Sequence, residues 1–162
     1  FLPAFIVGTL LIIIFESMWI FLSIGVLISL VFLLNPLYYI KYGMGFDGPW
    51  LKVEHLNLYI GKACSSIDSI LLYCAFFIVI FALDYKKIYL TRTIIFFFIG
   101  LIGVYIVNII RLFLLTIIGV HISEDLAVGL FHTNAGWVFF ILYFLVYYWI
   151  IKRFVYKRTE NE

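Results

Sequence analysis

The sequence predicts an all-α protein, a polytopic bundle of four or five transmembrane helices. Three observations predict this class. Of the 162 residues, 66% are hydrophobic and only 12% are charged, against about 45–50% and about 25% in a typical soluble domain. Four apolar stretches are each long enough to cross a hydrocarbon core of about 30 Å. No internal repeat or low-complexity linker divides the chain, so residues 1–162 are expected to form a single membrane-embedded domain.

The first apolar stretch covers about residues 2–34 and is interrupted only by Glu16. At about 1.5 Å per residue, its helix would be longer than the hydrocarbon core is thick. It is therefore either one long tilted helix or two segments broken near Glu16. Asn35 and Pro36 stop this stretch, and the glycines that follow predict an irregular segment over residues 35–62.

Three further apolar stretches, at about residues 63–83, 93–119 and 135–151, can each span the membrane once. Basic residues crowd the connection between the first two of these and follow the third: Lys86, Lys87, Arg92, Lys152, Arg153, Lys157 and Arg158. Positively charged loops tend to stay in the cytoplasm. The pattern therefore predicts a multi-pass protein of the cell (inner or plasma) membrane, with residues 35–62 and 120–131 on the extracytoplasmic face. A net charge of +2 gives no indication of a nucleic-acid partner.

One arginine, Arg111, stands inside the third stretch. A guanidinium costs roughly 2.5–3.5 kcal/mol at the centre of a membrane helix and stays charged. That cost is tolerated where the charge faces protein, water or substrate. In the predicted orientation Arg111 lies roughly 12 Å below the outer end of its helix, Cys64 begins the second stretch, and His132 precedes the fourth. A thiol, a guanidinium and an imidazole from three helices are thus expected in one extracytoplasmic layer.

These three side chains form the candidate catalytic site, because their chemistry suits a cysteine nucleophile. A thiol in the first turn of a helix and beside Arg111 is favoured as thiolate. His132, also at a helix start, would stay neutral and serve as a general base or acid. Arg111 would hold a substrate carboxylate or stabilise an oxyanion. Asn108, one turn before Arg111, would orient the guanidinium or add a donor.

Two further polar residues are candidates for a supporting role. Asp68 lies one turn after Cys64, where it would orient His132 or Arg111, although a carboxylate close to the thiol opposes thiolate formation. Asn134 lies two residues after His132. The chain has no metal-ligand spacing such as HxxxH or CxxC and no Gly-rich phosphate loop, so neither a metal nor a cofactor is predicted.

The residues alone leave other interpretations open. Arg111 could form a structural pair with Asp68 while Cys64 only packs. The protein would then be a non-catalytic membrane scaffold, or a subunit of a transporter or assembly complex. A membrane acyltransferase that uses His132 and Asn108 is a third interpretation, and it leaves the cysteine and the arginine unexplained.

Three motifs resemble those of the exosortase/archaeosortase family, and they occur in that family's order on successive helices. Residues 62–70, K-A-C-S-S-I-D-S-I, are similar to the family's A-C-(S/T)-G-I-x-S segment. Residues 108–112, N-I-I-R-L, are similar to its N-x-x-R segment. Residues 131–140, F-H-T-N-A-G-W-V-F-F, are similar to its H-x-x-x-G-W-x-F-F segment. The resemblance covers residues 62–140.

The resemblance implies a membrane-embedded cysteine transpeptidase or protease. Members of that family act on exported proteins that end in a short motif, a transmembrane helix and a basic tail. They cut at the motif through a thioacyl intermediate and transfer the new C-terminus to an acceptor. By this resemblance Cys64 is the nucleophile, Arg111 the transition-state stabiliser and His132 the general base or acid. The implied partners are such exported proteins, an acceptor nucleophile of unknown identity and the lipid bilayer. Ser66 departs from the family's glycine.

Overall fold

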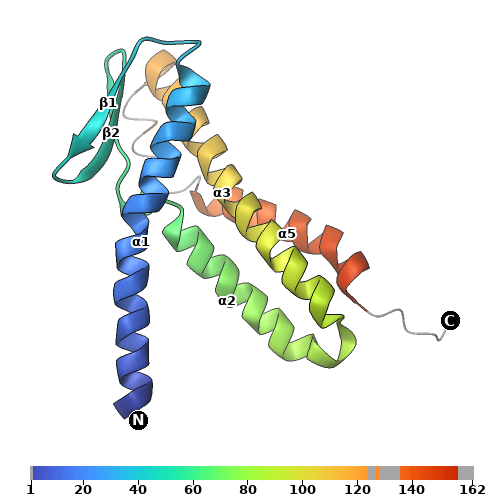
Figure 1. Ribbon diagram of the computed structural model, residues 1–162. Coiled ribbons are helices and arrows are strands. Elements are labelled where there is room, and N and C mark those ends of the chain that lie inside the picture. The colour runs from blue at the N-terminus through green and yellow to red at the C-terminus, as the bar shows by residue number, and fades with distance from the viewer. Residues whose placement is uncertain (1, 124–126, 128–135, 157–162) are drawn as a thin grey trace.

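The computed structural model describes residues 2–123, 127 and 136–156 (Figure 1). Its long helices are α1 (Leu2–Leu34), α2 (Ile67–Asp84), α3 (Leu90–His121) and α5 (Gly136–Val155), and two 3-10 helices, η1 (Lys62–Cys64) and η2 (Tyr85–Lys87), flank α2. Within this described part, four helices are long and apolar enough to cross a membrane. Helix α3 contacts each of the other three. The predicted all-α transmembrane bundle is confirmed, with four such helices.

Helix α1 is continuous over 33 residues. The break considered near Glu16 does not occur, so the first apolar stretch is one long helix. At about 1.5 Å per residue it is about 50 Å long, which exceeds a hydrocarbon core of about 30 Å.

The glycines between α1 and α2 suggested an irregular segment. That segment instead forms a three-stranded antiparallel sheet. Its strands are β1 (Ile40–Gly45), β2 (Gly48–Val53) and β3 (Leu56–Tyr59), in the order β1-β2-β3. The strands are joined by two-residue turns, and the backbone has a positive φ of 112° at Gly48 and of 56° at Glu54. Such φ values are what tight hairpin turns demand. Gly45 and Gly48 therefore flank the first hairpin turn, and Gly43 leaves room for the Trp50 ring of the neighbouring strand.

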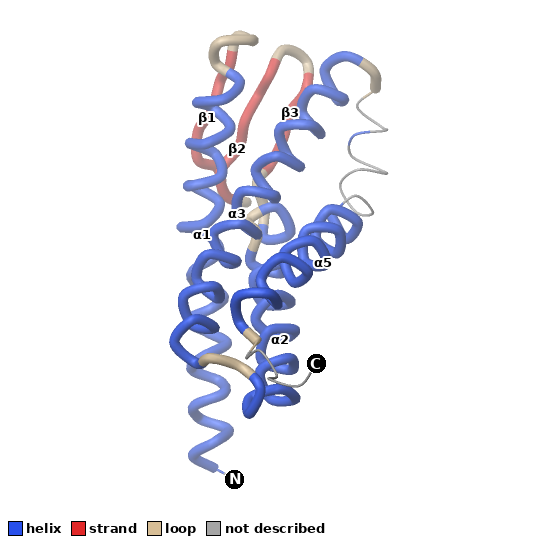
Figure 2. The backbone as a smooth tube through the Cα atoms, turned by 90° about the vertical axis from the view of Figure 1, so that its right-hand side faces the viewer, coloured by secondary structure: helices blue, strands red, loops and turns tan. Residues whose placement is uncertain are grey.

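The sheet has one apolar face, which packs against α1 and the C-terminal part of α3 (Figures 1 and 2). Tyr38 Oη lies 2.6 Å from His121 Nε2 and joins the start of the sheet to the end of α3. The main hydrophobic cluster combines residues of α1, the sheet, the region of η1 and α3: Val26, Leu27, Leu30, Leu34, Leu51, Val53, Ile60, Cys64, Leu112, Leu115 and Ala127. Cys64 is thus part of a core shared by all these elements.

Three tyrosine hydroxyls hold α2 and α5 against α3. Tyr73 of α2 donates to the carbonyl of Phe97, at 3.2 Å, and Tyr143 of α5 donates to that of Gly100, at 2.9 Å. Tyr147 donates to the carbonyl of Phe96. A side chain at Gly100 would collide with the Tyr73 hydroxyl, so the glycine is what lets the helices approach. In an apolar bundle such bonds satisfy the hydroxyls and set the helix positions.

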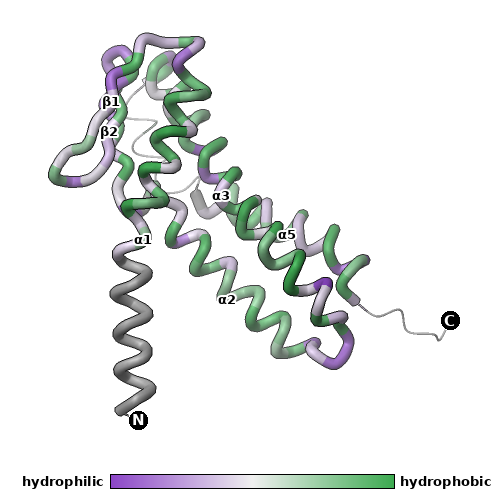
Figure 3. The backbone as a smooth tube through the Cα atoms, viewed as in Figure 1, coloured by the Kyte–Doolittle hydropathy of each residue, from purple (hydrophilic) through white to green (hydrophobic). Residues whose placement is uncertain are grey.

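The outer surfaces of the helices are apolar. Large hydrophobic side chains are exposed on each of α2, α3 and α5, among them Val79, Ile102 and Leu142. Figure 3 shows hydrophobic residues along these helices and hydrophilic ones at the connection between α2 and α3. Exposed apolar surface on this scale is expected of helices that face lipid.

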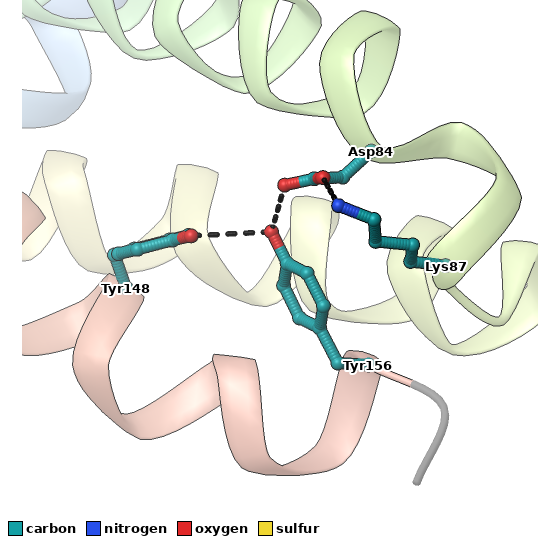
Figure 4. A network of polar contacts seen from close by, with 4 residues as sticks. All are labelled: Asp84, Lys87, Tyr148 and Tyr156. Carbon is teal, nitrogen blue, oxygen red and sulfur yellow. Dashed lines mark hydrogen bonds and ion pairs between the residues drawn. The ribbon is translucent and has the colours of Figure 1, made fainter. Parts of the chain in front are cut away.

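The connection between α2 and α3 is tied to the end of α5 by four residues, Asp84, Lys87, Tyr148 and Tyr156, which we call the Asp84 network (Figure 4). Tyr156 Oη donates to Asp84 Oδ2 at 2.5 Å and lies 3.2 Å from Tyr148 Oη. Lys87 Nζ lies 3.2 Å from Asp84 Oδ1. One member of the basic cluster predicted at this end, Lys87, therefore pairs with a carboxylate that also accepts a hydrogen bond from a tyrosine.

Candidate active site

The sequence suggested that Cys64 lies in the first turn of a helix. In the structure it lies just before α2. It ends η1, where its N–H donates to the Gly61 carbonyl at 3.0 Å, and α2 begins three residues later at Ile67. The helix dipole acts mainly within the terminal turn of a helix. The expected stabilisation of a thiolate by α2 is therefore weaker than predicted, and Cys64 depends on its neighbours in space.

Asn108 is the first of these neighbours. It is buried in α3, and its Nδ2 donates to the backbone carbonyl of Cys64 at 2.9 Å. The sequence predicted that Asn108 would orient the Arg111 guanidinium or add a donor. In the structure its amide donates to the main chain of the nucleophile candidate. A buried carbonyl without a donor is costly, so this bond fixes the height of Cys64 against α3.

Arg111 is the second neighbour. It lies one turn after Asn108, and only 7% of its surface is exposed, against 4% for Cys64. Its guanidinium lies beside the Cys64 side chain, close enough for its charge and its N–H groups to act on the thiol. Burial raises the pKa of the Cys64 thiol, while the nearby Arg111 acts to lower it. Two of the three predicted catalytic side chains are therefore in contact.

An open cleft between α2, α3 and α5 reaches both of these α3 residues. Its lining consists of Ser69, Val104, Val107, Asn108, Arg111, Phe139, Phe140 and Tyr143. His132 and Asn134 lie outside the described residues. Helix α5 begins at Gly136, four residues after His132, and its first turns line this cleft together with Arg111.

Asp68 is not part of this arrangement. It lies in the first turn of α2 with its side chain exposed, and no ion pair joins it to Arg111, both residues being described. The structural pair of the scaffold interpretation is therefore not formed.

Ser66 occupies an unusual backbone conformation, with φ 76° and ψ −5°. Such left-handed values favour glycine, because a Cβ there costs roughly 1–2 kcal/mol. The residue is buried, and among the described residues its Oγ has no hydrogen-bond partner. Ser65 is satisfied instead: its Oγ donates to the Lys62 carbonyl at 2.6 Å and accepts from the Ile67 N–H at 3.4 Å. The site thus keeps a glycine-type turn although it has a serine.

Comparison with known families agrees with the motifs and extends beyond them. The model of the transmembrane exosortase family matches residues 3–149. The chain belongs to this family. The match includes α1 and the sheet as well as the three motif segments, so the sheet is part of the exosortase region and not an addition to it. Searches of the curated proteins and of the solved structures found no significant match.

Proposed function

We propose that this exosortase-family protein is a cysteine transpeptidase or peptidase that cleaves C-terminal sorting signals of exported proteins. The observation that supports this most directly is the buried contact between the Arg111 guanidinium and the Cys64 thiol, with Asn108 holding the Cys64 carbonyl. Packing alone does not require a charged group in an apolar bundle, since an apolar residue of similar volume costs less. A transition state with negative charge does require one.

The proposed reaction has two steps. The Cys64 sulfur attacks the carbonyl of the scissile peptide, a C–S bond forms, and the C–N bond breaks as the leaving amine takes a proton. An amine or hydroxyl acceptor, or water, then attacks the thioacyl carbon and releases Cys64. Arg111 stabilises the oxyanion in both steps. His132 moves the proton, the role that the family resemblance implies for it.

The burial of Cys64 affects the ionisation of its thiol. Burial outweighs the nearby Arg111, so the pKa of Cys64 is raised overall and the thiol form is favoured in this state. A general base is then needed when the substrate binds. This requirement supports a role for the imidazole of His132, which precedes the helix that lines the Arg111 cleft.

The proposed substrates follow from the environment of the site. A protein with a C-terminal membrane helix shares the bilayer with the exosortase, and the segment before its helix reaches the interface at the level of Cys64. The basic clusters near Asp84 and after α5 favour an extracytoplasmic position for Cys64, at the opposite end of α2. The enzyme would then act on chains that have already been exported.

The function is tested with a reporter library. Each reporter is an exported protein followed by a short randomised segment, a Leu/Ala helix of about 20 residues and an arginine tail. Co-expression with the wild-type protein should yield reporters with a new C-terminus, which mass spectrometry reads together with any attached acceptor. Cys64→Ala should abolish the cut. Cys74, the other cysteine of the chain, lies within α2, and Cys74→Ala should preserve the cut. Cleavage by Cys64→Ala, with the protein inserted normally, would exclude the proposed chemistry.

A non-catalytic scaffold is the competing function, and the burial of Cys64 in the main hydrophobic cluster favours it. The two functions differ in thiol chemistry. In an enzyme, Cys64 should be alkylated from the extracytoplasmic side by a membrane-impermeant maleimide faster than Cys74. A packing cysteine in the same cluster would be protected until the protein unfolds.

A further inference from the structure

Strand β3 leads directly to Cys64. It ends at Tyr59, and only residues 60–63 separate it from Cys64. It is also an edge strand, because the sheet order is β1-β2-β3. Figure 2 shows β3 running from the outer end of the sheet down toward the start of α2. A chain lying along β3 in the same direction would arrive at Cys64.

The ladder shows which backbone groups of β3 face outward. Ile60 N–H donates to the Pro49 carbonyl at 2.8 Å. Counting back from this bond in steps of two along the register, Leu58 opposite Leu51 and Leu56 opposite Val53 are the hydrogen-bonded positions. Bonding alternates along an antiparallel pair. The residues between these, Asn57 and Tyr59, therefore direct their N–H and C=O groups away from β2. No backbone hydrogen bond joins that outer edge to another segment of the described chain.

The side chains leave this edge accessible. Leu56 and Leu58 are directed to the apolar face, where Leu56 is fully buried. Asn57 is exposed, and Tyr59 is 61% exposed on the opposite face. Neither edge residue is charged, neither is a proline, and the strand is not bulged. Proteins usually protect exposed edges by such devices, and an edge without them is suited to strand addition.

We propose that the segment of the substrate immediately before the scissile bond binds as a fourth strand, parallel to β3 at its outer edge. This inference rests on the proposed function and adds the mode of substrate recognition. The substrate chain runs from the exported domain toward its membrane helix, and β3 runs toward the membrane segment α2. The two chains therefore have the same direction. Main-chain hydrogen bonds provide affinity, and alternate substrate side chains provide specificity.

The opposite edge does not serve equally well. The backbone groups of Ile40, Tyr42 and Met44 face the outer edge of β1, because the residues between them make the backbone hydrogen bonds to β2. It lies two strand spacings, about 10 Å, from β3. A substrate strand there would miss Cys64, which follows β3 in the chain. The β1 edge is thus a matched control within the same sheet.

The test uses a substrate selected from the reporter library. Asn57→Pro removes an outward N–H of β3 without removing a β2–β3 bond, and Tyr42→Pro does the same on β1. We expect Asn57→Pro to reduce cleavage by about tenfold or more, and Tyr42→Pro to leave it within about twofold. Maleimide labelling of Cys64 checks that both variants keep the site intact. Equal cleavage by the two variants would overturn the proposal.

A proline scan of the substrate provides a second readout that does not depend on the folding of the variants. Strand pairing predicts that cleavage falls at every second position before the cut, because only alternate N–H groups face β3. Uniform sensitivity, or none, would contradict strand addition. Because the scan requires a substrate that the wild-type protein cleaves and Cys64→Ala does not, failure of this inference is distinguishable from failure of the proposed function.

Discussion

The two ends of the bundle treat polar groups in opposite ways. In the Asp84 network a carboxylate has a tyrosine and a lysine as partners, and Lys87 is largely exposed. Around Cys64 a guanidinium is buried next to a thiol, and Ser66 adopts a left-handed conformation with an unsatisfied hydroxyl among the described residues. The Asp84 network, with its polar groups paired, is what we expect of contacts that only stabilise the structure. Strain and buried charge are expected where stability is exchanged for chemistry.

The largest expected effect is on reporter cleavage, which should depend on the arginine beside Cys64 and not on an arginine near the Asp84 network. Arg111→Met should reduce reporter cleavage by about 10²–10³-fold, because the oxyanion loses its fixed positive partner. Its melting temperature in detergent should change little or rise, because a buried charge is removed. Arg92→Met, close to the Asp84 network, removes an exposed bond to the Phe154 carbonyl and should not affect cleavage. Parallel loss of stability and cleavage in Arg111→Met would show a structural arginine.

The next effect tests whether Asn108 positions Cys64. Asn108→Leu leaves the Cys64 carbonyl without its donor and should cost about 1–3 kcal/mol of stability. Cleavage should also fall about tenfold, with kcat changing more than KM. Thr116→Val is the control, since it removes a buried bond to the Leu112 carbonyl of the same helix. If both variants lose cleavage equally, Asn108 has no special role at the nucleophile.

The pH dependence of the thiol sharpens the comparison further. Burial holds the pKa of Cys64 above its usual range, so thiolate increases as pH rises through neutrality. In a Cys74→Ala background, maleimide labelling of Cys64 should rise about tenfold per pH unit between about pH 6 and pH 8. Because Arg111 lowers this pKa, Arg111→Met should move the curve to higher pH. An unchanged curve would mean that the guanidinium does not act on the sulfur.

The strain at the Cys64 end can be measured by relieving it. Ser66→Gly removes both the Cβ from a left-handed position and a buried hydroxyl without a described partner. Stability should increase by about 1–2 kcal/mol, read from thermal unfolding in detergent, with cleavage retained. Ser66→Ala keeps the Cβ and should therefore increase the stability by less than Ser66→Gly does. Destabilisation by glycine would show that the hydroxyl has a role that the backbone geometry does not reveal.

The smallest expected effect concerns the structural end. Tyr156→Phe removes the donor to Asp84 and should cost about 0.5–1.5 kcal/mol. Reporter cleavage should stay at the wild-type level, because the network lies at the opposite end of α2 from Cys64. A cleavage defect without a stability defect would show that the two ends are coupled.

Much of the fold could be predicted because lipid imposes it. Apolar stretches of sufficient length must form helices, since backbone groups in hydrocarbon have no other partners. The observed spans accordingly lie close to the predicted ones. The sheet was missed because its strands are four to six residues long and contain glycine, a pattern that also occurs in loops. Its pairing depends on α1 and α3, which cover its apolar face.

The candidate site could be predicted in part. Residue types and spacing pointed to Cys64, Arg111 and Asn108, because a charge within a membrane helix is costly unless it faces protein, water or substrate. The partners of each were less predictable. Asn108 holds a backbone carbonyl, Asp68 faces outward, and His132 lies outside the described residues.

The amino-acid sequence by itself determined the helical class, a count of four or five spans and the family, because hydropathy and short motifs can be read without knowing how the chain packs. Tertiary structure alone decided that Cys64 sits in a short turn beneath a sheet, with Arg111 on its side chain and Asn108 on its main chain. These contacts join residues more than 40 positions apart. Only the packing of α3 against the turn before α2 brings them together.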